Sequence, residues 1–341
     1  MRKLDSRTYL YIALAGLVLI LVLTVTYMLT PVSKADQTQY VYIDDDDTQD
    51  SVVAKVGAFG HTAGMTGLCM LVRHSDYANH IRTGRYAIEP SEGAFVVFRK
   101  LKSGRQSSMM LTIPEVRTMD RLAAILAQKL MLDSATIATA LYDEATCQQL
   151  GYDTCTIAAM FVPNSYDIYW NVSLNKLLQR MQREHDRFWK GDREQKASQM
   201  QLTPNEVCTL ASIIDEETAN NAEKPMIAGM YLNRLHAPMP LQADPTIKFA
   251  LKQFALKRIY NKLLNVESPY NTYRNEGLPP GPIKVASVKG IDAVLNYVRH
   301  DYLYMCAKED FSGTHNFART YQEHLMNAAR YTKALNERGI E

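Results

Sequence analysis

The stretch TPNEVCTLASIIDEET, from Thr203 to Thr218, predicts a helix with a defined start and one buried face. Thr203 is a good N-cap residue, Pro204 suits the first helical position, and Glu206 completes a capping box. Behind this start, apolar residues recur at helical spacing, at positions 207, 210, 211, 213 and 214. We therefore expect a helix that packs an apolar stripe into a protein core.

Three consecutive carboxylates end this helix. At roughly 100° per residue, Glu217 lies about 50° from the centre of the apolar stripe, Asp215 about 110° away and Glu216 about 150° away. The geometry predicts that Glu217 is the one directed toward the packed side, whereas Glu216 faces water. Burial disfavours the charged form of a carboxyl group and raises its pKa, as a general acid requires. Taken alone, the stretch also fits a solvated acidic face.

The composition is that of a globular protein of two or three domains. The 341 residues carry a formal net charge of +2, and no basic stripe with interleaved aromatics predicts a nucleic-acid partner. The chain has no phosphate-binding GxxxxGK[ST], no GxGxxG, no HExxH and no GxSxG. Its eight histidines lack metal-ligand spacing, so neither a metal nor a cofactor is expected.

A membrane anchor is predicted near the N-terminus. Thr8 to Thr30 contains 23 residues without a charge, enough to cross a bilayer core of roughly 30 Å. The basic residues Arg2, Lys3 and Arg7 precede it, which places the N-terminus in the cytoplasm. A cleaved signal peptide ending near residues 33–35 is the alternative, but the apolar run is longer than such a segment needs.

The five cysteines form no CxxC pair and no zinc-like spacing. Their odd number rules out complete internal pairing in an oxidising compartment. Cys147 and Cys155 could form one local disulfide, and Cys208 follows the apolar side of the helix described above. We expect mostly free, buried thiols.

The remaining chain alternates short strands and helices. Strands are predicted at 39–43, 85–88, 109–113 and 303–307. Helices are predicted at 117–141, 172–190, 223–235 and 322–337. A polar linker, an extended or turn segment and a proline-rich shaped loop are expected at 31–38, 239–246 and 268–283.

Five blocks carry a resemblance to a known family. In chain order they are LASIIDEET (210–218), PLQADPT (240–246), SPYNTY (268–273), GLPPGPI (277–283) and GTHNF (313–317). Together they resemble the endolytic murein transglycosylases, the MltG or YceG-like family, over roughly residues 39–335. The resemblance implies an α+β chain: a cytoplasmic tail (1–7), a transmembrane helix (8–30), a linker with a small LysM-like α+β module (31–110), and a mixed α/β catalytic domain of the YceG-like type (111–341).

The resemblance also implies an activity. Members of this family cleave nascent peptidoglycan glycan strands internally, between MurNAc and GlcNAc, leave 1,6-anhydroMurNAc ends and thereby terminate strand elongation. The implied location is the cytoplasmic membrane with the catalytic domain outside the cytoplasm, near peptidoglycan synthases. The family's essential glutamate stands before threonine in a pattern similar to SI[IV]EKET, which is Glu217 here. Asp215 and Glu216 depart from that pattern, and their added negative charge is expected to raise the pKa of Glu217 further.

The implied chemistry uses one carboxyl group twice, first as an acid on the glycosidic oxygen and then as a base on the C6 hydroxyl of muramic acid. Sugar contacts are expected from Asp215, Gln242, Asp244, Tyr270, Asn271, Tyr273, His315 and Asn316. Two alternatives remain open at this stage. One is a non-catalytic, membrane-anchored scaffold that binds glycan or synthases, and the other is a muramidase that uses water.

Overall fold

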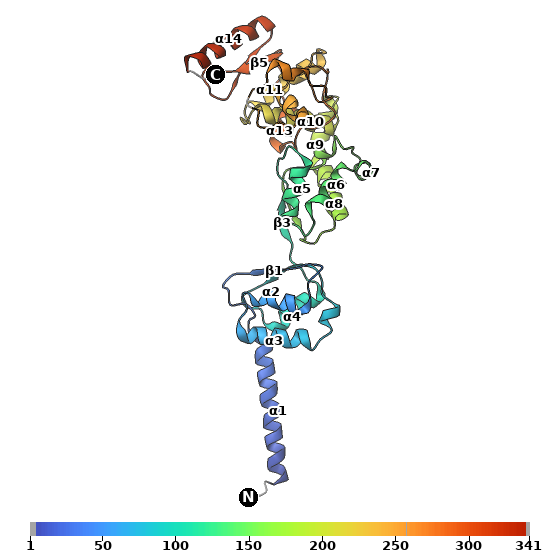
Figure 1. The fold of residues 1–341 in the computed structure, drawn as a ribbon, viewed down its shortest axis with the longest axis vertical. Helices are drawn as coiled ribbons and strands as arrows, with labels where there is room; N and C mark the ends of the chain where they lie inside the picture. Colours follow the sequence, from blue (N-terminus) through green and yellow to red (C-terminus); the bar gives the residue numbers. More distant parts are fainter. Residues whose placement is uncertain (1–4, 257, 339–341) are drawn as a thin grey trace. The chain divides into compact units, whose positions relative to one another are not determined.

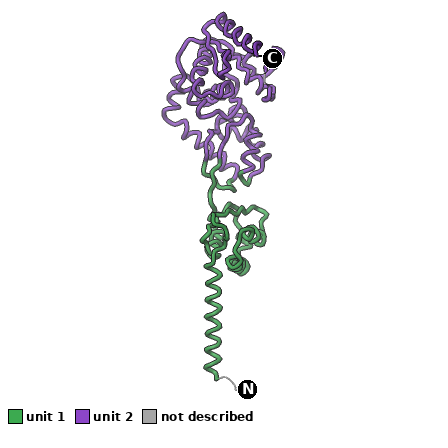
Figure 2. Tube along the Cα trace, turned by 90° about the vertical axis from the view of Figure 1, so that its left-hand side faces the viewer, with its two compact units in different colours: residues 1–111, 129–131, 166–172 green, residues 112–128, 132–165, 173–341 purple. Residues whose placement is uncertain are grey.

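The computed structural model describes residues 5–256 and 258–338. These residues form two compact units (Figure 2). The first unit contains the chain up to residue 111 together with 129–131 and 166–172, and the second contains 112–128, 132–165 and 173 onward. Helices and strands are mixed along the chain, as the sequence predicted (Figure 1).

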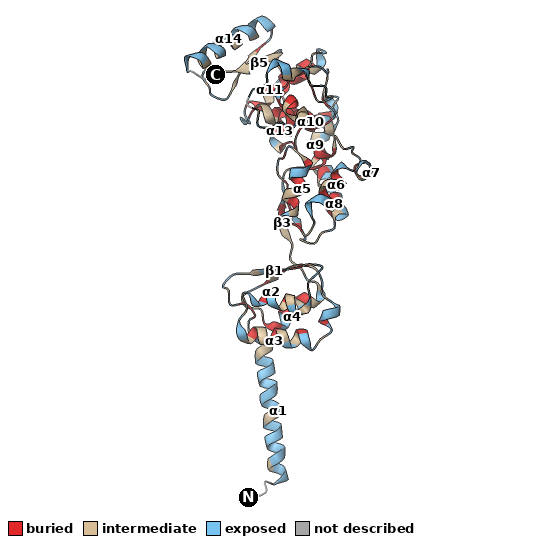
Figure 3. Cartoon of the chain, in the orientation of Figure 1, coloured by how far each residue is buried: buried red, intermediate tan, exposed pale blue. Residues whose placement is uncertain are grey.

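The first unit begins with α1, Ser6–Leu29. This helix is apolar and long enough to cross a membrane, and it buries none of its residues within the protein (Figure 3). An apolar helix that is exposed along its length needs an apolar surrounding of its own. The predicted membrane-length helix is therefore confirmed, and it starts two residues earlier than expected.

A small α+β module follows α1. Strands β1 (Gln39–Ile43) and β2 (Gly84–Ile88) pair antiparallel, with Val41 opposite Tyr86. Between and after them lie α2 (Gln49–Gly57), α3 (Thr62–Arg73) and α4 (Ala94–Ser103), whose apolar faces share one core with both strands. Strand β3 (Met109–Thr112) pairs with β4 (Ser165–Ile168) in a separate two-stranded sheet. The strands predicted in this part of the chain are confirmed.

The segment after α1 is not the polar linker that the sequence predicted. Val32 and Ser33 are buried, and Val32 belongs to the core of the module. The Val32 N–H donates to the Glu92 carbonyl at 2.9 Å, and its carbonyl accepts from the N–H of His61 at 2.7 Å. Val32 thus ties the chain directly after α1 into the module.

The second unit is mainly helical. Its helices are α5 (Met119–Ala127), α6 (Ser134–Tyr142), α7 (Glu144–Gln149), α8 (Leu174–Trp189), α9 (Asp192–Gln199), α10 (Pro204–Glu217), α11 (Lys224–His236), α12 (Asp244–Ala250), α13 (Val288–Leu295) and α14 (Tyr321–Glu337). Strands β5 (Tyr304–Ala307) and β6 (His315–Ala318) pair antiparallel, and α14 packs against both. Short 3₁₀ turns occur at Tyr77–Asn79, Ile157–Met160 and Asn261–Asn265.

Two helix predictions need correction. The helix expected over 117–141 is two helices, α5 and α6, because Asp133 accepts from the N–H of Thr136 and caps a new start. The segment 239–246, expected to be extended or a turn, is helical from Asp244 onward, because Pro245 occupies an N-terminal helical position that proline tolerates. The proline-rich loop over 268–283 is confirmed as irregular.

Helix α10 is the centre of the second unit. Its predicted capping box between Thr203 and Glu206 is present, and every residue from Val207 to Ile214 is buried. Helices α9, α11, α12 and α13 all pack against it. A helix that is surrounded in this way buries more than one side. The packing on each side therefore determines the surroundings of its three terminal carboxylates.

All five cysteines are free, and the local disulfide between Cys147 and Cys155 does not form. Cys147 and Cys208 are buried, whereas the other three are partly exposed. The expectation of free thiols is confirmed, and the expectation of burial holds for these two.

Candidate active site

Glu217 is the last residue of α10. Thr218 leaves the helix in an extended conformation, with φ −145° and ψ 138°, so the chain turns away immediately after the glutamate. The side chain of Glu217 reaches a cavity of about 400 Å³. The lining residues are Glu217, Met230, Tyr231, Arg234, Leu241, Gln242, Asp244, Tyr273, Met305, Cys306, Ala307, His315 and His324.

The pKa of Glu217 is raised to about 7. Burial is the largest cause, because the carboxylate would lose most of its hydration, and the negative charge of Asp244 raises the pKa as well. The hydrogen bond from Tyr231 and the charges of His315 and Lys248 act in the opposite direction. Near neutral pH a large fraction of Glu217 therefore keeps its proton.

Tyr231 holds one oxygen of this carboxyl group. Its hydroxyl donates to Glu217 Oε1 at 2.8 Å. Burial and the neighbouring Glu217 raise the pKa of Tyr231 well above its ordinary value, so the phenol remains a donor. Because Oε1 accepts this hydrogen bond, a proton on the acid is best placed on Oε2, where it can be given to a ligand.

Asp244 and Tyr273 form a second polar pair in the cavity. Asp244 is the first residue of α12, where a helix N-terminus favours a negative charge. The Tyr273 hydroxyl, from the proline-rich loop, donates to Asp244 Oδ1 at 2.6 Å. The loop predicted to be shaped thus places a tyrosine beside an acid from a different block of sequence.

Gln242 reaches the cavity from a strained backbone position. Its φ is +52°, in the left-handed region that non-glycine residues seldom adopt. The N–H of Gln242 donates to the Thr272 carbonyl, and the next N–H, of Ala243, donates to Thr272 Oγ1. These two bonds join the PLQADPT and SPYNTY blocks into one wall of the cavity.

Arg234 is a buried cation that joins three segments around the cavity. Its guanidinium donates to the carbonyls of Leu303 at 2.6 Å and Leu241 at 2.7 Å. One bond leads to the residue before β5 and the other to the segment before α12. Because a buried guanidinium must satisfy its donors, these contacts fix the cavity walls relative to α11.

His315 enters the cavity from the start of β6. Glu223, the residue before α11, accepts from both the His315 N–H at 2.6 Å and the ring atom Nδ1 at 3.0 Å. The side chains of His315 and Glu223 are 15% and 8% exposed. This double contact fixes the orientation of the imidazole ring.

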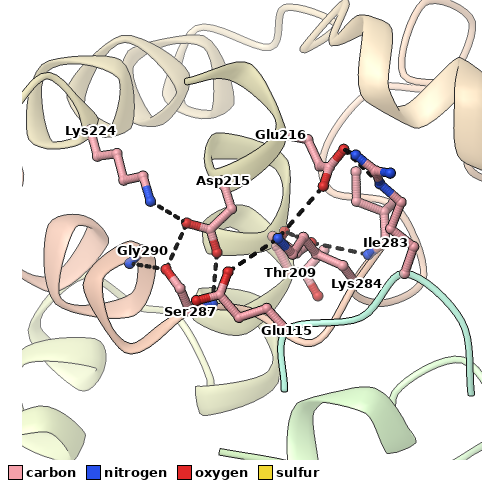
Figure 4. Close-up of polar contacts among 11 residues, drawn as sticks. Glu115, Thr209, Asp215, Glu216, Lys224, Ile283, Lys284, Ser287 and Gly290 are labelled. Carbon is pink, nitrogen blue, oxygen red and sulfur yellow. Dashed lines mark hydrogen bonds and ion pairs between the residues drawn. The ribbon is translucent and has the colours of Figure 1, made fainter. Parts of the chain in front are cut away.

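Asp215 does not line the cavity, contrary to its expected contact with sugar. Its side chain is 1% exposed and accepts from Lys224 at 2.7 Å, from the Ser287 N–H at 2.7 Å and from the Ser287 hydroxyl at 2.8 Å (Figure 4). Both oxygens are thus used to join α10 to α11 and α13. Asp215, which the helical wheel placed between Glu217 and Glu216 in its angle to the apolar stripe, is buried because α13 covers that side of the helix.

Glu216 does not face water as predicted. Its side chain is 14% exposed and forms an ion pair with Arg117 at 2.8 Å. A second ion pair joins it to Lys284 at 3.6 Å (Figure 4). Asp215 and Glu216, which were expected to raise the pKa of Glu217, are not among the largest causes of its shift. The neighbouring negative charge among those causes is that of Asp244, whereas the other two carboxylates have cationic partners.

Three more residues expected to contact sugar lie outside the cavity lining. Tyr270 packs its ring against Phe249 at 4.7 Å between centroids. Asn271 is fully buried and donates to the carbonyls of Leu264 and Val266, both at 2.8 Å, and Asn316 donates to Glu309 at 2.7 Å. These three side chains hold loops and a hairpin together, whereas Gln242, Asp244, Tyr273 and His315 do reach the cavity.

The sequence did not point to Tyr231, Arg234 or His324, which also line the cavity. For the first two a signal existed, since both follow Ile227 at helical spacing on the buried side of α11. A phenol and a guanidinium on an apolar helix face need partners, and they find them at this site. His324 lies on α14, and its Nδ1 is buried without a hydrogen-bond partner in the described part of the chain. No comparable signal in the sequence pointed to His324.

A buried carboxyl group of raised pKa in a polar cavity is an arrangement suited to acid catalysis. The model of the YceG-like family matches residues 41–330, so the chain belongs to this family. Residues 5–256 and 258–338 contain no group of three or more His, Cys, Asp or Glu side chains that could hold a metal ion.

Two relatives and one solved structure are similar to this chain. The endolytic murein transglycosylase of Bacillus subtilis strain 168 is 28% identical in an alignment of length 277 that covers 76% of this chain and 76% of the relative. That of Streptococcus pneumoniae strain D39 is 25% identical in an alignment of length 341 that covers 90% of this chain and 62% of the relative. A YceG-like protein from Listeria monocytogenes has a crystal structure with a TM-score of 0.55 and 24% identity, covering 86% of this chain and 99% of that one. The last comparison supports the fold, and none of the three identifies the small module as LysM-like.

Proposed function

We propose that this chain is a membrane-anchored endolytic murein transglycosylase with Glu217 as its catalytic acid. The observation that carries the proposal is a glutamate of pKa about 7 at the end of α10, facing a polar cavity. Two relatives bear this name, and the chain belongs to their fold family. The substrate is the glycan strand of peptidoglycan, cleaved internally between MurNAc and GlcNAc.

The reaction begins with a proton from Glu217. With Oε1 held by Tyr231, the proton leaves Oε2 for the glycosidic oxygen, and the bond from that oxygen to C1 of the muramic acid breaks. The C6 hydroxyl of the same sugar attacks C1 and closes the 1,6-anhydro ring. In the single-carboxyl form of the mechanism, Glu217 takes the proton of that hydroxyl and returns to its starting state. The nucleophile belongs to the substrate, so no catalytic water is needed.

The remaining cavity residues bind the sugars on either side of the broken bond. Gln242, Asp244, Tyr273 and His315 present amide, carboxylate, phenol and imidazole groups to the cavity, the groups that hydroxyl-rich rings use as partners. Asp215, Tyr270, Asn271 and Asn316 act indirectly, since their side chains hold the surrounding elements in place.

Helix α1 anchors the enzyme beside its substrate. By the positive-inside rule, Arg2, Lys3 and Arg7 support an orientation with residues 1–7 in the cytoplasm and the chain beyond residue 30 outside it. In this arrangement residues 31–110 form a LysM-like module and residues 111–341 the catalytic domain, which meets nascent strands close to the synthases that extend them. Cleavage there terminates strand elongation.

The test is mass spectrometry of the products formed from purified, uncrosslinked glycan strands. The full-length chain in detergent is compared with Glu217→Gln, which keeps the acceptor for Tyr231 but has no proton to give. We expect internal fragments with anhydromuramoyl ends from the wild type and none from the variant. Reducing muramic acid ends would indicate a muramidase that uses water, and strand binding without cleavage by either protein would indicate a scaffold.

A further inference from the structure

His315 and Glu223 form a carboxylate–imidazole pair at the wall of the cavity that contains Glu217. Both oxygens of Glu223 are directed to the same residue, one to the backbone N–H and one to ring atom Nδ1. A carboxylate accepts hydrogen bonds, so Nδ1 carries the hydrogen and Nε2 is left with its lone pair. His315 lines the cavity and its Nδ1 contacts Glu223, which leaves Nε2 as the ring nitrogen available to a ligand.

This arrangement suits a base. A carboxylate bound to one imidazole nitrogen fixes the tautomer and stabilises the imidazolium that forms when the other nitrogen accepts a proton. Glu223 has no other cation within ion-pair distance in the described residues, because the neighbouring Lys224 pairs with Asp215. The pair also lies within electrostatic reach of the acid, since the charge of His315 lowers the pKa of Glu217.

We propose that His315 is a second catalytic residue, which takes the proton of the muramoyl C6 hydroxyl at Nε2, and that Glu223 is its positioning residue. The inference rests on the proposed function and differs from the single-carboxyl mechanism at one step. A buried pair could also serve only to attach β6 to the start of α11. The backbone N–H bond to Glu223 achieves that attachment without the imidazole.

Protons and electron pairs balance over the cycle. Glu217 gives a proton to the glycosidic oxygen, the bond from C1 to that oxygen breaks, and its electron pair stays with the leaving GlcNAc. The C6 oxygen forms a bond to C1 and loses its proton to His315. The imidazolium then returns one proton to the ionised Glu217, directly or through water, so the enzyme is restored without net uptake or release.

The experiment compares His315→Gln, Glu223→Gln and Glu217→Gln with the wild type in the full-length chain, using uncrosslinked glycan strands as the probe. His236→Gln is the matched control, because His236 is an exposed histidine at the end of α11. Rates of anhydromuramoyl product formation give kcat and KM between pH 4 and 9. The titratable and charged groups around the cavity are Glu217, Tyr231, Arg234, Asp244, Tyr273, Cys306 and His324, with Lys248 close enough to act on Glu217 and Glu223 beside the ring.

For the wild type we expect kcat/KM to fall on both sides of an optimum, because His315 must be neutral while Glu217 is protonated. In His315→Gln, kcat should drop on the order of 100-fold with KM within about threefold, and the fall on the acid side should disappear. Glu223→Gln should shift the acid-side decrease of kcat/KM to lower pH. A decrease caused by the titration of Asp244 would stay at the same pH in this variant. His236→Gln should match the wild type.

The proposal is overturned if His315→Gln keeps the acid-side fall, or if its kcat stays within about threefold of the wild type. Should His315→Gln fail to fold, an unmoved acid-side fall in Glu223→Gln overturns it equally. Failure of the proposed function has a different signature. In that case the wild type forms no anhydromuramoyl ends, or Glu217→Gln forms as many as the wild type.

Discussion

At the scale of single residues, the site depends on a carboxyl group that the fold keeps protonated. Glu217 is surrounded by protein except where it meets the cavity, and Asp244 adds a negative charge nearby. Its pKa of about 7, against an ordinary value of 4.5, means that the folded chain binds this proton more strongly than the unfolded chain does. In the proposed mechanism the same shift keeps the catalytic proton on Glu217, so it would act on both stability and catalysis.

The stability contributed by Glu217 should depend on pH. Because the folded pKa is the higher one, this contribution is fully present below about pH 4.5 and is lost as the pH rises through about 7. Glu217→Gln removes that loss. We expect the melting temperature of the variant, relative to that of the wild type, to increase between pH 5 and pH 8. A difference that does not change with pH would show that Glu217 is not protonated by the fold.

Tyr231 should matter to the alkaline limit of activity. Its hydrogen bond lowers the pKa of Glu217, so Tyr231→Phe should raise that pKa and extend activity to higher pH. The carboxyl group also loses its support, and we expect kcat to fall about tenfold while strand binding is kept. The measurement is the pH profile of kcat/KM. An alkaline limit that moves to lower pH would contradict this assignment.

At the scale of elements, α10 shows how a surrounding helix layer distributes three adjacent carboxylates. Glu217 faces the cavity, Glu216 pairs with Arg117 and Lys284, and Asp215 is buried against α13. The Asp215–Lys224 pair is almost fully removed from water, with side-chain exposures of 1% and 7%. Such a pair is costly to break by removing one partner, because a buried charge is left without compensation.

Asp215→Asn should therefore destabilise the fold without changing the chemistry. We expect a loss of about 3 kcal/mol in the free energy of unfolding, with kcat per folded molecule within about twofold of the wild type. Glu216→Gln is the matched control on the next residue, and its more exposed pairs should cost less than about 1 kcal/mol. Denaturant titration and strand cleavage measure the two quantities. A large loss of kcat in a stable Asp215→Asn protein would return Asp215 to the binding site.

At the scale of the whole molecule, the chain is an apolar helix, a small α+β module and a larger helical unit. The segment directly after α1 belongs to the module, since Val32 is fully buried in its core. Cleavage near residues 33–35, the signal-peptide alternative, would remove Val32 from that core. The packing thus favours a retained anchor.

The module should need Val32. We expect a chain that starts at Asp36 to have a less stable module than one that starts at Pro31, by about 2 kcal/mol, the value of burying one valine side chain. Hydrogen exchange of the β1 and β2 amides measures this directly. Lys34→Ala in the longer chain is the control, because it keeps Val32 and Ser33 in place. Equal protection in both chains would show that residues 31–35 are a linker after all.

Sequence by itself determined the features that depend on neighbouring residues. The capping box and apolar spacing of α10, the inward position of Glu217, the length of α1 and the short strands of the module all follow from local patterns. Each arises because backbone geometry repeats over a few residues, so periodicity and caps can be recognised without knowing the fold. The five ordered blocks added the family, which the match over residues 41–330 confirms.

Only the tertiary structure decided which groups surround the acid. Tyr231 meets Glu217 across 14 residues of sequence, Ser287 meets Asp215 across 72, and His315 meets Glu223 across 92. These contacts depend on how α11 and α13 pack against α10 and on how β6 meets the start of α11, and no local pattern encodes that packing. The helical wheel failed for Asp215 and Glu216 for the same reason, because it assumes one buried face while α10 is enclosed on several sides. Which carboxylate keeps a proton, and which residues hold it, is therefore a property of the packed core.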